Sequence, residues 1–120
     1  MRVRYATLPV DDAERAIAFY TAKLRLTLVS DVAWEGHRRL ELAFPSGDVG
    51  LLLEQRMQPC ASHGPALVLG VPDVDAAYER LETLGVMFDT PPRESPRRAG
   101  VRFAIFRDSE DNLVRIETGA

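Results

Sequence analysis

Apolar and polar residues follow two different periods along the chain, and the same order of periods occurs twice. Residues 3–10 (VRYATLPV) mix polar and apolar side chains in the manner of a half-buried β-strand, and residues 66–71 (ALVLGV) form a short apolar run of strand length. In residues 13–24 and 74–84, apolar side chains recur every three or four positions, as in an amphipathic helix. Each half of the chain is therefore predicted to begin with a strand that is followed by a helix.

Further strand-like runs follow each predicted helix. They are residues 26–32, 38–44, 49–55, 86–90, 101–108 and 112–118. The order βαβββ thus occurs twice, and the predicted class is α+β, with two tandem βαβββ modules forming a curved mixed sheet with a cleft. We expect a single domain over residues 1–120, made of a first module (1–55), a linker rich in turn residues (56–64) and a second module (65–120).

A shift of 61 positions aligns the two halves. It pairs Asp12 with Asp73 at the helix starts, and Glu54 with Arg115 in the last strands. Two copies are too few for a solenoid, so the pattern indicates two fused modules.

The ends of the two helices carry their own signals. Asp11 is the expected N-cap of the first helix, with Glu14 completing a capping box, and Asp73 is the expected N-cap of the second. Gly85 is placed to end the second helix.

Strand alternation also predicts which residues share a face of the sheet. The apolar face, which is expected to lie under the helices, carries Ala6, Leu8, Leu51, Leu53, Leu67, Leu69, Val114 and Ile116. The opposite face carries Tyr5, Thr7, Leu52, Glu54, Ala66, Val68, Leu113, Arg115 and Glu117. A mixed face that no helix covers suits a ligand cleft.

Composition narrows the classes of function. The 120 residues carry a formal net charge of −3, which gives no basic field for nucleic acid. No apolar run approaches about 18 residues and the N-terminus lacks the apolar core of a signal peptide, so we expect a cytoplasmic protein that is not bound to a membrane. The single cysteine, Cys60, excludes an internal disulfide framework.

Three stretches resemble the vicinal oxygen chelate superfamily, which includes glyoxalase I, the bleomycin-resistance proteins and the extradiol dioxygenases. They are LPVDDAERAIAFYTAKL (8–24), VPDVDAAYERLETLGV (71–86) and FAIFRDSEDNLVRI (103–116). In the last stretch Asp111 stands where the superfamily usually has glycine. The resemblance implies paired βαβββ modules over nearly the whole chain, but a fold does not fix an activity.

The resemblance also implies where a metal would bind. The corresponding positions on the first and last strand of each module are Tyr5, Glu54, Ala66 and Arg115. A catalytic divalent metal needs about three protein ligands, and only Glu54 is an ordinary one here. We therefore expect no metal at these positions and no cofactor.

The expected ligand-binding residues lie on the uncovered face or near its rim. They are Tyr5, Thr7, Trp34, Glu54, Val68, Phe103 and Arg115. Glu54 and Arg115 are predicted to form an ion pair, and contact of either with a charged ligand group is the alternative. Trp34 is placed at a hairpin tip, where it packs on the protein or a subunit, or else on a ligand. Phe103 faces either the cleft or the core.

Residues 89–100 (DTPPRESPRRAG) are predicted to form a mobile surface loop, with a lid as the alternative. Their basic residues are interpreted as solvated, contact with an anion being the alternative.

These observations favour a metal-independent small-molecule-binding protein of the glyoxalase/bleomycin-resistance type that sequesters a drug or metabolite, with a homodimer as its expected assembly. Two alternatives remain. One is a metal-dependent lyase, isomerase or dioxygenase with an atypical site, and the other is a non-catalytic dimeric interaction subunit.

Overall fold

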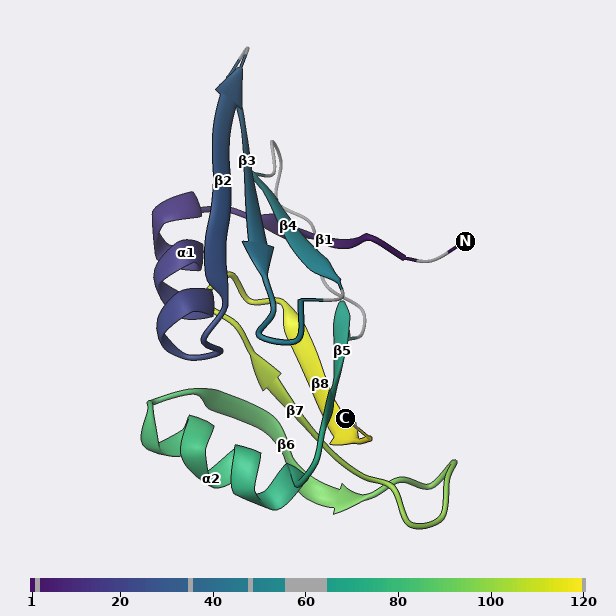
Figure 1. Cartoon of the computed structure of the whole chain (residues 1–120). Coiled ribbons are helices and arrows are strands. Elements are labelled where there is room, and N and C mark those ends of the chain that lie inside the picture. The colour runs from purple at the N-terminus through teal and green to yellow at the C-terminus, as the bar shows by residue number, and fades with distance from the viewer. Residues whose placement is uncertain (2, 35, 48, 56–64, 120) are drawn as a thin grey trace. The chain divides into compact units, whose positions relative to one another are not determined.

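The computed structural model describes residues 1, 3–34, 36–47, 49–55 and 65–119. The chain divides into two compact units, Met1–Ala61 and Ser62–Ala120 (Figure 1). Among the described residues, neither helix has the length and hydropathy of a membrane-spanning segment.

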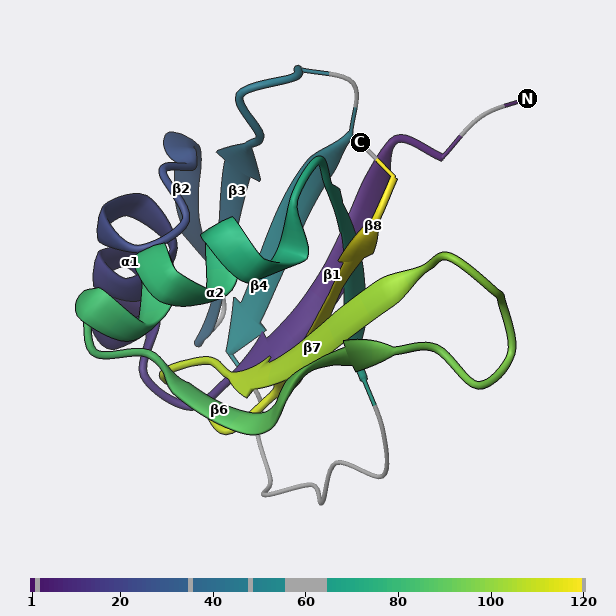
Figure 2. The same cartoon turned by 90° about the horizontal axis from the view of Figure 1, so that it is seen from below.

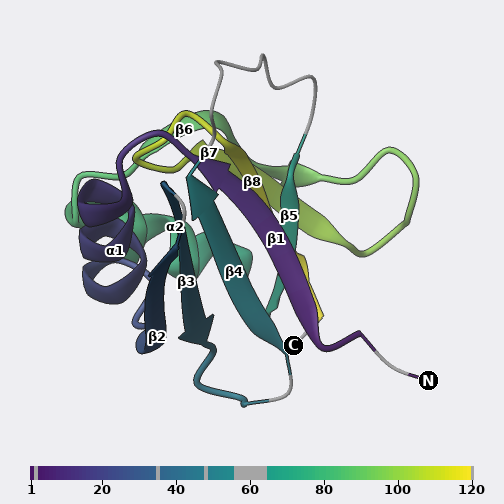
Figure 3. The same cartoon turned by 90° about the horizontal axis from the view of Figure 1, so that it is seen from above.

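The first unit is a four-stranded sheet with one helix against it (Figure 3). Its elements are β1 (Tyr5–Val10), α1 (Ala13–Ala22), β2 (Thr27–Trp34), β3 (His37–Ala43) and β4 (Gly50–Gln55). The strand order is β1-β4-β3-β2; β1 runs parallel to β4, and the other pairs are antiparallel.

The second unit repeats this arrangement. Its elements are β5 (Leu67–Val71), α2 (Val74–Thr83), β6 (Met87–Glu94), β7 (Arg102–Arg107) and β8 (Leu113–Thr118). The strand order is β5-β8-β7-β6, again with one parallel pair, β5 with β8. The predicted tandem βαβββ architecture is confirmed.

Each core forms between the helix and the face of the sheet that the sequence predicted to be apolar. The predicted residues Leu8, Leu51, Leu53, Leu67, Val114 and Ile116 are buried. The helices complete the two cores with Ala13, Ala16, Tyr20, Val74, Ala77 and Leu81, which are also buried. Burial of these side chains removes apolar surface from water, which is the main driving force for the association of helix and sheet.

The start of α1 corrects one prediction. Its N-cap is Asp12, not Asp11: Asp12 has extended backbone, and its Oδ1 accepts a hydrogen bond from the Arg15 amide at 3.1 Å. Glu14 therefore lies one position too early for a capping box, and its Oε1 accepts a 2.6 Å hydrogen bond from Arg38 Nη2 on β3. The repeat carried the correct signal, because it paired Asp12 with Asp73.

The two ends of α2 are as predicted. Asp73 caps the N-terminus by accepting a hydrogen bond from the Ala76 amide at 3.1 Å. At the other end Gly85 has a φ of +89°, which side chains other than glycine rarely adopt. The Gly85 and Val86 amides donate to the Glu82 and Leu81 carbonyls, each at 3.0 Å, which closes the last turn.

The prediction of a loop over residues 89–100 is wrong for its first half, because β6 continues to Glu94. Pro91 and Pro92 are tolerated there because β6 is the edge of its sheet, and proline cannot donate to a second neighbour. The remaining turn between β6 and β7 extends beyond the sheet (Figure 2). It is closed by the Ser95 amide, which donates to the Val101 carbonyl at 2.7 Å, and by the Gly100 amide, which donates to Glu94 Oε1 at 3.2 Å.

Candidate functional site

A hollow of about 680 Å³ lies on the uncovered face of the second unit. Its floor includes Val68 of β5, Phe103 of β7, and Arg115 and Glu117 of β8. The register brings these residues onto one face, since Val68 pairs with Arg115 and Phe103 pairs with Glu117. Three of the residues predicted to bind a ligand, Val68, Phe103 and Arg115, therefore line one hollow.

Two contacts hold the Arg115 side chain on this floor. Its guanidinium carbon lies 4.0 Å from the centroid of the Phe103 ring, a cation–π arrangement. Its Nε donates to Glu117 Oε1 at 3.0 Å. Phe103 is buried although it lies on the face away from α2, because Arg115 covers its ring. This resolves the alternative that the sequence left open: Phe103 faces the hollow.

The turn between β6 and β7 supplies one wall. Ser95, Pro96, Arg97 and Arg98 line the hollow from this turn. The Ser95 side chain accepts a hydrogen bond from the Arg97 amide at 3.3 Å. Arg98 Nη1 lies 3.9 Å from Glu117 Oε2, which makes a long ion pair from the wall to the floor.

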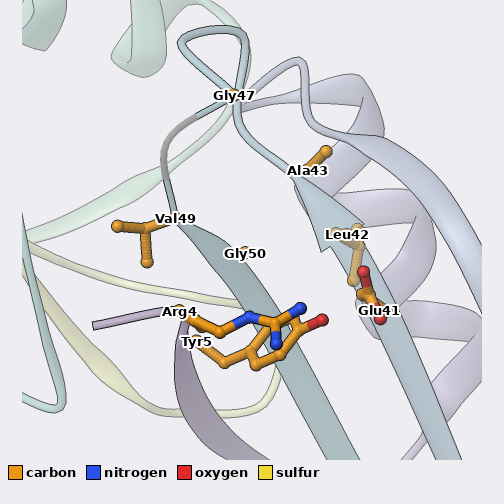
Figure 4. A pocket seen from close by; sticks show the side chains of 8 residues that line it. All are labelled: Arg4, Tyr5, Glu41, Leu42, Ala43, Gly47, Val49 and Gly50. Atoms are coloured by element: carbon orange, nitrogen blue, oxygen red, sulfur yellow. The ribbon is translucent and has the colours of Figure 1, made fainter. Parts of the chain in front are cut away.

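A smaller hollow of about 200 Å³ lies in the first unit around Tyr5. Figure 4 shows the Arg4 and Tyr5 side chains side by side, passing over Gly50 towards Glu41. The Arg4 guanidinium carbon lies 5.5 Å from the centroid of the Tyr5 ring. The ring lies so close to β4 that a Cβ on Gly50 would be 2.8 Å from Tyr5 Cδ1, so the glycine leaves the space that the ring occupies.

Glu54 and Arg115 each have a charged partner within their own unit. Glu54 Oε1 accepts from Arg39 Nε at 2.9 Å and lies 2.8 Å from Arg39 Nη2, across the β3–β4 pair. Arg115 is bound to Glu117 as described above. The Glu54–Arg115 pair that the repeat suggested would join the two units, and it stays a prediction.

The strand register corrects the alignment of the last strands. Thr7 pairs with Leu52 in the first unit, whereas Val68, which is 61 positions after Thr7, pairs with Arg115 in the second. The counterpart of Arg115 is therefore Leu52, and the last strands are offset by 63 positions, not 61. The sequence held a signal for this offset, because 63 positions separate Glu54 from Glu117 and match carboxylate with carboxylate.

The remaining predicted residues are not among those that line the larger hollow. Thr7 is exposed on β1. Trp34 ends β2 and pairs with His37 at the hairpin tip, while its side chain is outside the described residues. Cys60 and the whole predicted linker also fall outside them.

The side chains at the positions implied for a metal do not fit a divalent cation. Ala66 has no donor atom, and arginine offers a cation no lone pair. The register makes Glu117, not Arg115, the counterpart of Glu54, but Glu117 Oε1 accepts from Arg115 Nε at 3.0 Å and Glu117 Oε2 lies 3.9 Å from Arg98 Nη1. Glu54 is paired with Arg39 and lies four register positions beyond Gly50, the partner of Tyr5, so the two do not form adjacent ligands. Within the described ranges, no three His, Cys, Asp or Glu side chains gather as a metal-binding group.

Residues 2–116 match the family model described as Glyoxalase/Bleomycin resistance protein/Dioxygenase superfamily. The chain belongs to this superfamily. The predicted resemblance is thereby confirmed, and the βαβββ repeat described above is the fold that this membership implies.

Relatives of the Glyoxalase/Bleomycin resistance protein/Dioxygenase superfamily match nearly the full chain. "Uncharacterized protein YurT" of Bacillus subtilis (strain 168) is 34% identical, with 97% of this chain and 98% of the relative covered. The crystal structure of TnmS3, an antibiotic binding protein from Streptomyces sp. CB03234, is 29% identical with a TM-score of 0.82, covering 100% and 97% of the two chains. A superfamily member from Sphaerobacter thermophilus DSM 20745 is 27% identical with a TM-score of 0.84, covering 99% and 98%.

Proposed function

We propose that this protein binds a small organic molecule without a metal ion and thereby sequesters a drug or metabolite. The observation that carries the proposal is the hollow of about 680 Å³ on the second unit. Its floor combines an aromatic ring, an exposed valine and a paired arginine and glutamate. Small-molecule sites are typically hollows of about 300–1,000 Å³ with apolar walls and a few placed polar groups.

Two further findings support binding over metal-dependent catalysis. The side chains at the positions implied for a metal do not fit one, for the reasons of donor chemistry given above. In addition, TnmS3, which shares the fold and 29% of its residues with this chain, is an antibiotic binding protein.

We also propose that the first unit contributes to binding through Tyr5, Thr7, Trp34 and Glu54. Tyr5 and Thr7 lie on β1, Glu54 lies on β4, and Trp34 lies at the β2–β3 hairpin. A ligand that binds on the uncovered face of the first unit would meet these positions.

A homodimer in the cytoplasm is the assembly and location that we propose. The edge strand β2 supports self-association, because Leu28, Val29 and Val32 are exposed on it, and exposed apolar edges are favourable places for pairing. Light scattering coupled to size exclusion tests the assembly, and a monomer at micromolar concentration contradicts it. Cell fractionation tests the location.

Thermal-shift screening tests the binding function. Purified protein is screened against aromatic metabolites and glycopeptides with and without a chelator. We expect a compound that raises the unfolding temperature equally in both conditions. Val68→Trp, which places a large ring in the hollow, should abolish the shift. Met87→Trp is the matched control, because Met87 is also apolar and exposed on an edge strand but lies outside the hollow.

Two results would contradict the proposal. Stoichiometric Zn, Ni, Mn or Fe that is lost on Glu54→Ala would favour the metal-dependent enzyme. A stable dimer that no compound in the panel stabilises would favour the interaction subunit.

A further inference from the structure

We infer that the hollow of the second unit selects an anionic ligand, namely a flat apolar molecule that carries a carboxylate or a comparable anionic group. The anion would lie at the guanidinium groups of Arg97, Arg98 and Arg115, and the apolar body against Val68 and Pro96. This inference rests on the proposed binding function and adds the chemical class of the ligand.

The charge of the hollow is the first argument. Three arginines and one glutamate line it, which gives a formal charge of +2 in a chain whose total is −3. Arginine stays protonated in proteins, so this excess persists at any physiological pH. The hollow is thus a positive site on an acidic protein, and its charge does not follow from the overall composition.

The single carboxylate is shared and cannot neutralise the site. Glu117 accepts from Arg115 Nε at 3.0 Å and lies 3.9 Å from Arg98 Nη1. The Arg97 side chain has no charged partner among the residues that the structure describes. A ligand anion would supply the missing negative charge, and interactions between ionised groups are about twice as strong as neutral hydrogen bonds.

Arg115 is held ready for such a ligand. The guanidinium carbon lies 4.0 Å from the centroid of the Phe103 ring, and Glu117 accepts from Arg115 Nε, so the described contacts leave the terminal Nη donors for a ligand. A planar guanidinium that is already fixed loses less conformational entropy on binding than a free side chain. The contact with Phe103 therefore orders the Arg115 guanidinium for binding an anion.

The apolar part of the hollow argues against a bare inorganic anion as the ligand. Val68 is 54% exposed on the floor, and Pro65 and Pro96 also line the hollow. A flat organic body would cover Val68 and remove its surface from water. The hollow around Tyr5 makes a useful contrast, because Arg4 and Glu41 give it a formal charge of zero. Selection by charge is therefore expected only in the second unit.

Calorimetric titration with 2-naphthoate and 2-naphthamide tests the inference, because the two probes share one ring system and differ in charge. We expect the carboxylate to bind at least tenfold more tightly, and its affinity to fall as salt is raised. Arg115→Met and the double variant Arg97→Met/Arg98→Met should each weaken binding of the carboxylate about tenfold and change the affinity for the amide much less. Arg80→Met is the control, since it removes the same charge from α2, outside the hollow.

Arg115→Lys keeps the charge and serves if Arg115→Met fails to fold; it should bind the carboxylate with an intermediate affinity. Equal affinity for the two probes would overturn selection by charge and leave the binding function standing. Preferential binding of the carboxylate that Arg115→Met and Arg80→Met weaken equally would overturn the location. Failure of 2-naphthoate to bind would overturn the inference. The binding function itself is tested separately, by the thermal-shift panel.

Discussion

The packing of Tyr5 on Gly50 gives a quantitative prediction about the first unit. A Cβ at position 50 would lie 2.8 Å from Tyr5 Cδ1 and 2.9 Å from Cε1, closer than carbon atoms approach without displacement. Tyr5 is 37% exposed and its ring can rotate away, so Gly50→Ala should move the ring rather than unfold the strand. Exposure of on the order of 50 Å² of apolar ring surface at about 25 cal/mol per Å² costs about 1 kcal/mol.

The sign of the effect should depend on Tyr5. In a Tyr5→Ala background no ring opposes the new methyl group, and Gly→Ala stabilises by about 0.4–1 kcal/mol through the unfolded chain. When Tyr5 is present, we expect Gly50→Ala to lower the free energy of unfolding by about 0.5 kcal/mol. In the Tyr5→Ala background, we expect the same substitution to raise it by about 0.5 kcal/mol. The coupling energy between the two positions is then about 1 kcal/mol.

Urea denaturation of the four proteins in this double-mutant cycle measures the coupling, with the slope of the transition checked for constancy. Tyr5→Phe is the control for the hydroxyl group, because it keeps the ring and should keep the coupling. If Gly50→Ala changes the free energy of unfolding equally in the Tyr5 and Tyr5→Ala backgrounds, the ring does not lie over Gly50 and the described hollow is wrong.

Three further predictions concern single residues of the first unit. Arg25 has a φ of +61°, so Arg25→Gly should raise the free energy of unfolding by about 0.5–1 kcal/mol in urea denaturation; a decrease would show that the left-handed backbone is not strained. Asp12→Ala should lower the free energy of unfolding by about 1 kcal/mol, and Asp11→Ala should change it by less than about half of that; the reverse order would restore Asp11 as the cap. A hydrogen bond from Arg38 lowers the pKa of Asp31 below its ordinary value, so the stability that this pair contributes is present at neutral pH and is lost as the pH falls through the lowered value. Asp31→Asn should therefore make the unfolding temperature fall less steeply as the pH is lowered below about 5, and an unchanged pH profile would contradict the pairing.

The duplicated fold could be predicted because its signals are local. Period-two and period-3.6 patterns mark the elements, and the face that each strand turns towards the helix follows from which residues are apolar. The errors occurred where the signal was ambiguous by one or two positions. Asp11 and Asp12 are both suitable caps, and the last strands match at an offset of 61 or 63. Pro91 and Pro92 favoured a loop in the sequence, but they lie in an edge strand, which tolerates proline where a central strand does not.

The candidate site could be predicted only in part. Strand parity placed Val68 and Arg115 on the uncovered face, and the structure brings them into one hollow with Phe103. Glu117 was placed on the same face but was given no role, although it is the residue that binds Arg115. Ser95, Pro96, Arg97 and Arg98 were assigned to a surface loop. Their place in the wall depends on tertiary contacts such as the 3.9 Å approach of Arg98 Nη1 to Glu117 Oε2 on β8.

The sequence by itself determined that two βαβββ modules form and which strand faces are buried. These properties depend on residue type and on spacing along one strand or helix. Only the tertiary structure decided which charges meet. Arg115 on β8 contacts Phe103 on the neighbouring strand β7, and Glu54 on β4 pairs with Arg39 on the neighbouring strand β3. Such contacts depend on hydrogen-bonded register, because a shift of two residues changes every cross-strand partner while each side chain stays on the same face of the sheet.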